Sequence, residues 1–504
     1  MNQNRSSPDL YDLIQTFNST EKRHFRLFAS RGYKDENQYL RLFDILEGQS
    51  AFDDVAGMKK LKVSSKSGYA RIKNYLYNSL LESLEDYCKD YTLDDRFCHL
   101  INRIRILISK HLFSQATKLL KKAYKMADEK GLSTFHLIAE RIELSLMARA
   151  EDFRGIENYM DGYDNRMKQH MMRAEYSVNL QMIGGKITWL LRYGESQPNN
   201  HQDWLVELCN HNLLSSIKYP SDLKYKLFYD NFNGLVYGLK GMVDEDNKHL
   251  KSYLEIYQSN PEYIQCWPTN YITALGNVAE GAADKQNYAV VLECTSEMRT
   301  FFDTYNIRNK STIEHVAQTH STCLEMEAWS TFTAVHKEEV LQRLLKCWRY
   351  KRHVTKLWYF NMALGIARYH FEKEAYNKAN DWIIKVIHDP DDILEPQIQF
   401  GSRFLHLLNQ YELGHNMVFE HAIPVFKEWM RKVKIKSTTV NLFLRSLKKL
   451  IYIPLKTTRN EEWNQLLSLL EIEMQKREEF MTIRRIDILG CVCSKTTVLS
   501  KTNQ

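Results

Sequence analysis

Apolar residues recur along most of this chain at intervals of three and four, the period of one face of an α-helix. The clearest stretch places Ala367 and Ala379 twelve residues apart with Tyr376 between them, and Ile383 follows before Pro390. A small residue on each of two crossing helices lets their axes approach to about 8–10 Å, whereas a larger side chain would force them apart. The pattern predicts a helical hairpin whose second helix ends at Pro390.

The same offsets recur as partial matches along the chain. Their spacing is 39 or 40 residues, except for an interval of 51 between Ala289 and Val340, and residues 164–225 fit the pattern poorly. The matching positions include Ile104, Ala116, Leu144, Ile156, Gly238, Leu250, Ala289, Ala328, Val340 and Phe419. Such a period predicts a stack of helical hairpins. An irregular antiparallel bundle remains the alternative, because it shows similar spacing.

The helical patterns divide the chain into four regions. Residues 1–92 form an N-terminal helical region, and residues 93–436 hold the repeats. Residues 437–480 carry two helices that would close the array, the first capped by Ser437. Residues 481–504 show no helical period, and we expect a mobile tail.

Composition supports an all-α fold. The 504 residues include only 19 Gly and 9 Pro, fewer than the turns of an all-β or doubly wound fold would need. No stretch approaches the roughly 18 uninterrupted apolar residues of a membrane span. The first residues lack the apolar run of a secretory signal. The nine cysteines are scattered and odd in number, which argues against a disulfide framework. We expect reduced thiols, a cytoplasmic protein and no membrane partner.

No motif in the chain carries catalytic chemistry. Gly184–Lys186 lacks the first Gly and the following hydroxyl of a phosphate loop, and we interpret it as a turn entering a helix. Cys491 and Cys493 have no His nearby to complete a zinc site. His315 and His320 are five apart, whereas a zinc protease helix needs four. We therefore predict no catalytic residue, no cofactor, no metal and no enzymatic activity.

Basic clusters are the one polar signal that points to a function. From Lys427 to Arg459 the chain has ten Lys or Arg against one acid, Glu428, and from Arg343 to Lys356 it has six with no acid. Such clusters either form a positive groove for an acidic peptide or a nucleic-acid backbone, or are solvated helix faces. The candidate binding residues of the first cluster are Lys432, Lys434, Arg445, Lys448 and Lys449.

Three segments near the start, Glu21–Phe25, Tyr39–Phe43 and Lys73–Tyr77, resemble bacterial tetratricopeptide-like proteins of an uncharacterised group. The resemblance extends loosely through the repeats to about residue 430. It implies a right-handed α-solenoid of tetratricopeptide-like hairpins. It implies no activity and no ligand-binding residue.

Tetratricopeptide geometry would place Asn361, Leu364 and Arg368 one helical turn apart on the concave side. The Asn amide could hydrogen-bond an extended peptide, and the Arg could hold a carboxylate with two hydrogen bonds. The alternative is that Arg368 forms a salt bridge with an acid of the adjoining repeat. These residues support our first hypothesis, a non-enzymatic cytoplasmic scaffold that binds a peptide or protein on its concave face.

A second hypothesis comes from the N-terminal region. A helix at Asp53–Leu61, a turn at Lys62–Ser65 and a helix carrying Lys66, Arg71 and Lys73 have the layout of a helix-turn-helix. The chain would then be a DNA-binding transcriptional regulator whose repeats sense a partner. Against this, the turn lacks Gly, and residues 1–92 hold 14 basic and 13 acidic side chains.

Overall fold

The protein is all-helical in the computed structural model, throughout the part of the chain that the structure describes. The described residues are 8–30, 38–90, 92–129, 132–151, 153–193, 198–216, 218, 222–305, 307, 310–349, 354–388, 396–433, 435–453 and 456–473. The chain forms two compact units, Met1–Ala174 and Glu175–Gln504, and the boundary lies inside one long helix. Each unit is described by itself.

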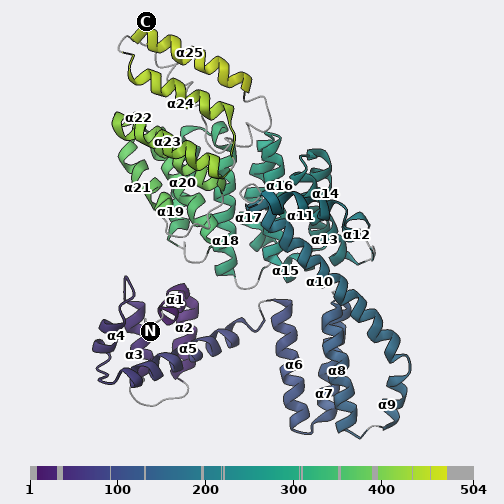
Figure 1. The fold of residues 1–504 in the computed structure, drawn as a ribbon. Helices are drawn as coiled ribbons and strands as arrows, with labels where there is room; N and C mark the ends of the chain where they lie inside the picture. The colour runs from purple at the N-terminus through teal and green to yellow at the C-terminus, as the bar shows by residue number, and fades with distance from the viewer. Residues whose placement is uncertain are drawn as a thin grey trace. The chain divides into compact units, whose positions relative to one another are not determined.

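The helices of the first unit are α1 (Asp9–Thr16), α2 (Ser19–Ser30), α3 (Gln38–Glu47), α4 (Asp54–Lys60), α5 (Lys66–Cys88), α6 (Leu93–Ser109), α7 (Phe113–Glu129), α8 (Ser133–Arg149), α9 (Phe153–Met160) and the start of α10 (Tyr163–Tyr193). In this unit, α1, α2 and α3 pack against α5, whereas α6 to α9 pack each beside the next (Figure 1). Helices α1 to α5 share a core around Phe25, Phe43 and Leu76, which are fully buried.

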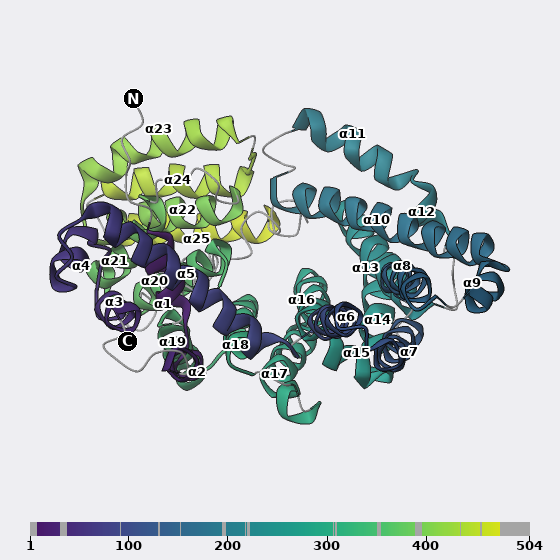
Figure 2. The ribbon, with the colours of Figure 1, turned by 90° about the horizontal axis from the view of Figure 1, so that it is seen from below.

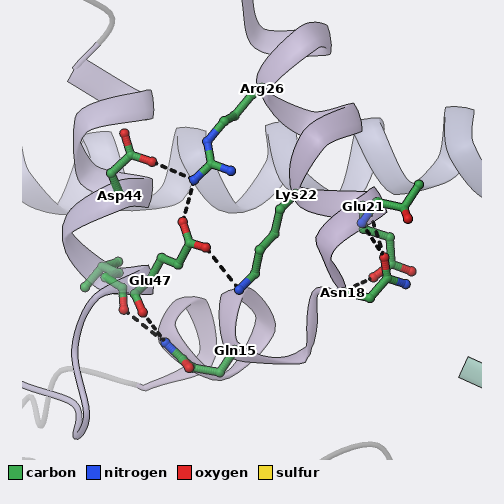
Figure 3. A network of polar contacts seen from close by, with 9 residues as sticks. Gln15, Asn18, Glu21, Lys22, Arg26, Asp44 and Glu47 are labelled. Carbon is green, nitrogen blue, oxygen red and sulfur yellow. Dashed lines mark hydrogen bonds and ion pairs between the residues drawn. The ribbon is translucent and has the colours of Figure 1, made fainter. Parts of the chain in front are cut away.

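Polar contacts hold α1, α2 and α3 together at the surface of this core (Figure 3). Lys22 and Arg26 of α2 form ion pairs with Glu47 of α3, and Arg26 also contacts Asp44 at 2.9 Å. The Gln15 amide of α1 donates to the backbone oxygens at the end of α3. The network fixes how the three short helices meet.

The second unit contains the remaining helices. They are α11 (Pro198–Cys209), α12 (Asn212–Ser215), α13 (Leu223–Leu239), α14 (Val243–Ser259), α15 (Pro261–Cys266), α16 (Pro268–Asp284), α17 (Tyr288–Thr304), α18 (Lys310–Glu325), the 3₁₀ segment η2 (Met326–Thr331), α19 (Ala334–Trp348), α20 (Lys356–Glu372), α21 (Tyr376–Ile387), α22 (Pro396–Glu412), α23 (Asn416–Lys432), α24 (Thr438–Ile451) and α25 (Lys456–Glu473). Helices α22 to α25 pack in sequence, each beside the next (Figures 1 and 2).

The clearest predicted pair corresponds to α20 and α21, which pack against each other. Ala367 and Ala379 are fully buried in one cluster with Ile383 and Leu405. The second helix ends at Ile387, and Pro390 lies outside the described residues. The helix predicted to follow Ser437 is confirmed, and the Ser437 hydroxyl accepts a hydrogen bond from the Val440 amide.

A common turn ends many of the helices. Eight described residues have a positive φ, and each lies two positions after the last residue of a helix. They are Lys62, His111, Glu151, Gly162, Gly241, Gln286, Glu374 and Gly414. At His111, for example, the next amide, of Leu112, returns to the carbonyl of Leu107, which is the Schellman arrangement. This turn lets one helix be followed by the next after a short connection.

Candidate functional site

Asn361, Leu364 and Arg368 lie on one face of α20, and all three are half-buried. Leu364 packs against the cluster that contains the buried alanines of α20 and α21. The Arg368 guanidinium lies 3.5 Å from Glu372 of the same helix and 5.7 Å from the ring centre of Trp329. Its side chain is only 11 % exposed. One acid that Arg368 contacts, Glu372, is thus in its own helix.

Glu372 also contacts groups from outside α20. The Trp329 indole N–H of η2 donates to its carboxylate, and Lys337 of α19 forms an ion pair with it at 2.8 Å. Lys337 lies over the Trp329 ring as well, on the ring that Arg368 approaches. These contacts tie η2, α19 and α20 together, so a ligand of Arg368 would have to compete with a structural network.

The basic cluster predicted from Lys427 to Arg459 lies largely on α23 and α24. The Tyr452 hydroxyl at the end of α24 donates to Glu420 of α23 at 2.6 Å, which brings the exposed flanks of both helices together. Helical spacing places Lys427 and Arg431 on the flank of α23 that carries Glu420. We call the exposed cations of these helices the C-terminal basic surface: Lys427, Arg431, Lys432, Arg445, Lys448 and Lys449. Lys434 lies outside the described residues.

Two of these cations have acidic partners. Arg431 binds Glu428 with two hydrogen bonds of 2.8 and 2.9 Å, and the bonded guanidinium lowers the pKa of that carboxyl. Lys449 lies 3.3 Å from Glu462 of α25. Among the described residues, the other four cations of the surface form no ion pair with an acid, and Lys432 acts on Glu428 only at longer range. The surface therefore carries an excess of positive charge.

Apolar side chains lie on the same helix. Met417, Val418 and Val425 of α23 are 77 %, 50 % and 64 % exposed, and helical spacing puts them on the solvent side with Lys432. A cluster of exposed apolar residues beside charged ones is typical of a protein contact surface. The α23 face thus offers both apolar contact and positive charge.

The helix-turn-helix residues lie on α4 and α5. Asp53 caps α4, Ser65 caps α5, and Lys62 takes the left-handed conformation in the turn with a φ of 58°. The turn at Lys62–Ser65 therefore forms without a Gly, because Lys62 takes the backbone conformation that Gly favours. Lys66 and Arg71 are exposed, whereas Lys73 forms an ion pair with Asp54 of α4 at 2.9 Å.

The structure corrects our interpretation of Gly184–Lys186 as a turn. The segment lies inside α10, where Lys186 pairs with Glu207 of α11 at 2.6 Å. A Cβ on Gly184 would come within 2.7 Å of the Phe232 ring, so this Gly permits close packing of α10 against α13. Hydrophobic periodicity alone does not distinguish a Gly in a turn from a Gly at a contact between helices, because the contacting residue, Phe232, is distant in sequence.

The described residues contain no cluster of three His, Cys, Asp or Glu side chains placed to hold a metal ion. None of their helices is long and apolar enough to cross a membrane. The seven described cysteines form no disulfide, and Cys491 and Cys493 lie outside the described part.

No family model matches the chain, and no curated protein matches it.

Proposed function

We propose that this protein is a non-enzymatic cytoplasmic scaffold that binds an acidic peptide or protein segment at the C-terminal basic surface. Its helices would form a right-handed solenoid of tetratricopeptide-like hairpins that presents this surface. The observation that carries the proposal is the set of four exposed cations, Lys427, Lys432, Arg445 and Lys448, that form no ion pair with an acid of the described residues.

The surface also fits a peptide better than a free anion. Met417, Val418 and Val425 lie beside the cations and would give an apolar residue of the partner a contact. Apolar contact supplies affinity, whereas exposed charges mainly steer association and select the partner. We therefore expect a partner that combines Asp or Glu with a few apolar side chains, bound more weakly as salt increases.

The α20 face with Asn361, Leu364 and Arg368 is a second candidate contact. We rank it below the C-terminal basic surface because Arg368 already lies between Glu372 and Trp329. The binding free energy of a peptide carboxylate at Arg368 would be only the difference between its new contact and the Arg368–Glu372 contact that it replaces.

Selection of peptides from a random library on the immobilised full chain tests the proposal. We expect enriched peptides to be rich in Asp and Glu, and the Arg445→Ala, Lys448→Ala double variant to lose them. The control variant Lys248→Ala, Lys251→Ala removes two exposed lysines of α14 and should retain the same peptides. Enrichment of uncharged or basic peptides, or equal retention by both variants, would reject the acidic partner.

A further inference from the structure

The segment that contains α4 and α5 has a charge imbalance that the near-neutral total of residues 1–92 conceals. From Val55 to Leu81 the sequence contains no Asp or Glu, and it contains six Lys or Arg. Lys73 is the only one of the six with an acidic partner among the described residues. The other five are exposed: Lys59, Lys60, Lys62, Lys66 and Arg71.

The two helices are held in a fixed arrangement. A Cβ on Gly57 of α4 would lie 2.5 Å from the Tyr69 hydroxyl of α5, so the helices meet closely at that point. The Lys73–Asp54 ion pair joins them a turn further along. The turn between them closes with the Val63 amide donating to the Met58 carbonyl. A tight turn between two packed helices is the geometry that presents a second helix to a DNA groove.

The outer face of α5 has the residues that read DNA bases. Its first three turns expose Lys66, Ser67, Ala70, Arg71 and Asn74, while Tyr69 and Leu76 are buried on the other side. Ser67 and Ala70 are small enough for a helix backbone to approach a groove. Arg recognises guanine and Asn recognises adenine, each with two hydrogen bonds in the major groove.

We propose that α4 and α5 bind double-stranded DNA, with the first three turns of α5 in the major groove. Arg71 and Asn74 contact base edges, and Lys59, Lys60, Lys62 and Lys66 contact phosphates. Lys73 is a positioning residue that holds α5 against α4. This activity goes beyond the proposed scaffold function and does not depend on it.

The chemistry of the face selects DNA over other polyanions. The residues that would face the groove, Lys66, Ser67, Ala70, Arg71 and Asn74, include no large apolar side chain, and the exposed Tyr75 stacks on Tyr39 of α3 with ring centroids 4.1 Å apart. Beside the C-terminal basic surface, by contrast, lie three exposed apolar side chains of α23. An acidic peptide would therefore gain little apolar contact at α5. The deep, narrow major groove of RNA does not admit a helix, whereas that of B-DNA does.

Fluorescence anisotropy of a labelled mixed-sequence DNA duplex, titrated with the full chain over a range of salt, tests the proposal. We expect the Lys66→Ala, Arg71→Ala variant to bind about tenfold more weakly at low salt. The slope of log K against log salt should fall by about one, because Lys66 contacts a phosphate and Arg71 contacts a base. The Arg445→Ala, Lys448→Ala variant loses the same charge and should bind DNA like the wild type. Thermal unfolding of both variants should match the wild type, because the substituted side chains are exposed.

A selection from random duplexes tests the assignment of the base contacts. The wild type should enrich a motif, and Asn74→Ala should relax the preference at one position of it. Failure of the wild type to bind duplex DNA at low salt would overturn the proposal, and so would equal weakening by the two double variants. Tighter binding to duplex RNA of the same sequence would also overturn it.

Discussion

Glu325 shows how single residues connect distant parts of the chain. It is 2 % exposed at the end of α18. One carboxylate oxygen forms an ion pair with Arg299 of α17 at 2.7 Å, and the other accepts a hydrogen bond from Arg343 of α19 at 2.5 Å. Arg343 opens the second basic run of the sequence, yet its guanidinium points to a buried acid. Sequence alone could not show this, because the partner is 18 residues away in another helix.

Substitution of Glu325 by Gln should therefore strongly destabilise the second unit. Removing the acid leaves two guanidinium groups uncompensated, and we expect a loss of about 3 kcal/mol, the lower end for a broken buried pair because both arginines keep some solvent contact. Denaturant unfolding measures the loss. Glu428→Gln, which breaks an exposed pair with Arg431, is the control and should leave stability close to that of the wild type. Equal effects would show that burial of Glu325 does not matter.

The environment of His320 leads us to expect that the stability of the second unit depends on pH. The His320 ring packs against Trp358 with centroids 4.0 Å apart, and burial lowers the pKa of His320 to about 4. The unfolded chain takes up a proton below a pH of about 6.5 that the folded imidazole refuses, so stability falls as pH drops from about 6.5 to about 4.

The full lowering of the His320 pKa would correspond to a loss of about 3 kcal/mol in the free energy of unfolding. Because the His320 side chain is half-buried, we expect a loss of about 1–2 kcal/mol. Unfolding of the wild type and of His320→Gln, measured at several pH values, isolates this contribution. The variant should lose less stability than the wild type over that window. Parallel curves for the two proteins would contradict the account.

At the scale of the elements, the turns show why the repeats are hard to see in the sequence. Eight helices are followed by a residue in the left-handed conformation, but only three of the eight are Gly. A Lys, a His, two Glu and a Gln hold the same position elsewhere. The left-handed conformation recurs at these positions, but Gly, the residue that indicates it in a sequence, does not. The helical periods were therefore predictable, whereas the turns that join the helices were not.

The turn at Gly414 gives a prediction with an internal control. Its φ is +70°, and a Cβ there would meet nothing within 4 Å. Gly414→Ala should thus destabilise by about 1 kcal/mol through backbone strain alone. Gly185 inside α10 is equally open, but its φ is not positive, so Gly185→Ala should instead stabilise by about 0.5–1 kcal/mol. Thermal shifts of the same sign for both variants would contradict the turn geometry.

The α20–α21 contact gives a second prediction at this scale. Ala379 is fully buried beside Ala367, so Ala379→Leu should overpack the contact and cost about 1–3 kcal/mol. Lys378→Ala, at an exposed neighbouring position, should cost little. Thermal unfolding of both variants is the measurement, and equal shifts would show that the buried alanines do not limit the packing.

At the scale of the whole molecule, composition and period were enough to predict an all-helical chain, and the helices of the described residues confirm it. The division into compact units at Ala174 and Glu175 falls inside α10, where no break in composition marks it. The basic surface on α23 and α24 was visible as a run of charge. Which of its cations form no ion pair with an acid depended on the packing of α23, α24 and α25, which periodicity does not give.

The central claim is that the C-terminal basic surface binds acidic segments, and an anisotropy titration with a labelled all-Glu peptide tests it most directly. The wild type and the Lys248→Ala, Lys251→Ala control should bind the peptide, more weakly as salt rises, and a matched all-Lys peptide should not bind. The Arg445→Ala, Lys448→Ala variant should bind the all-Glu peptide about tenfold more weakly, as expected for two exposed charge contacts. No binding by the wild type, or equal affinity of the two variants, would contradict the account.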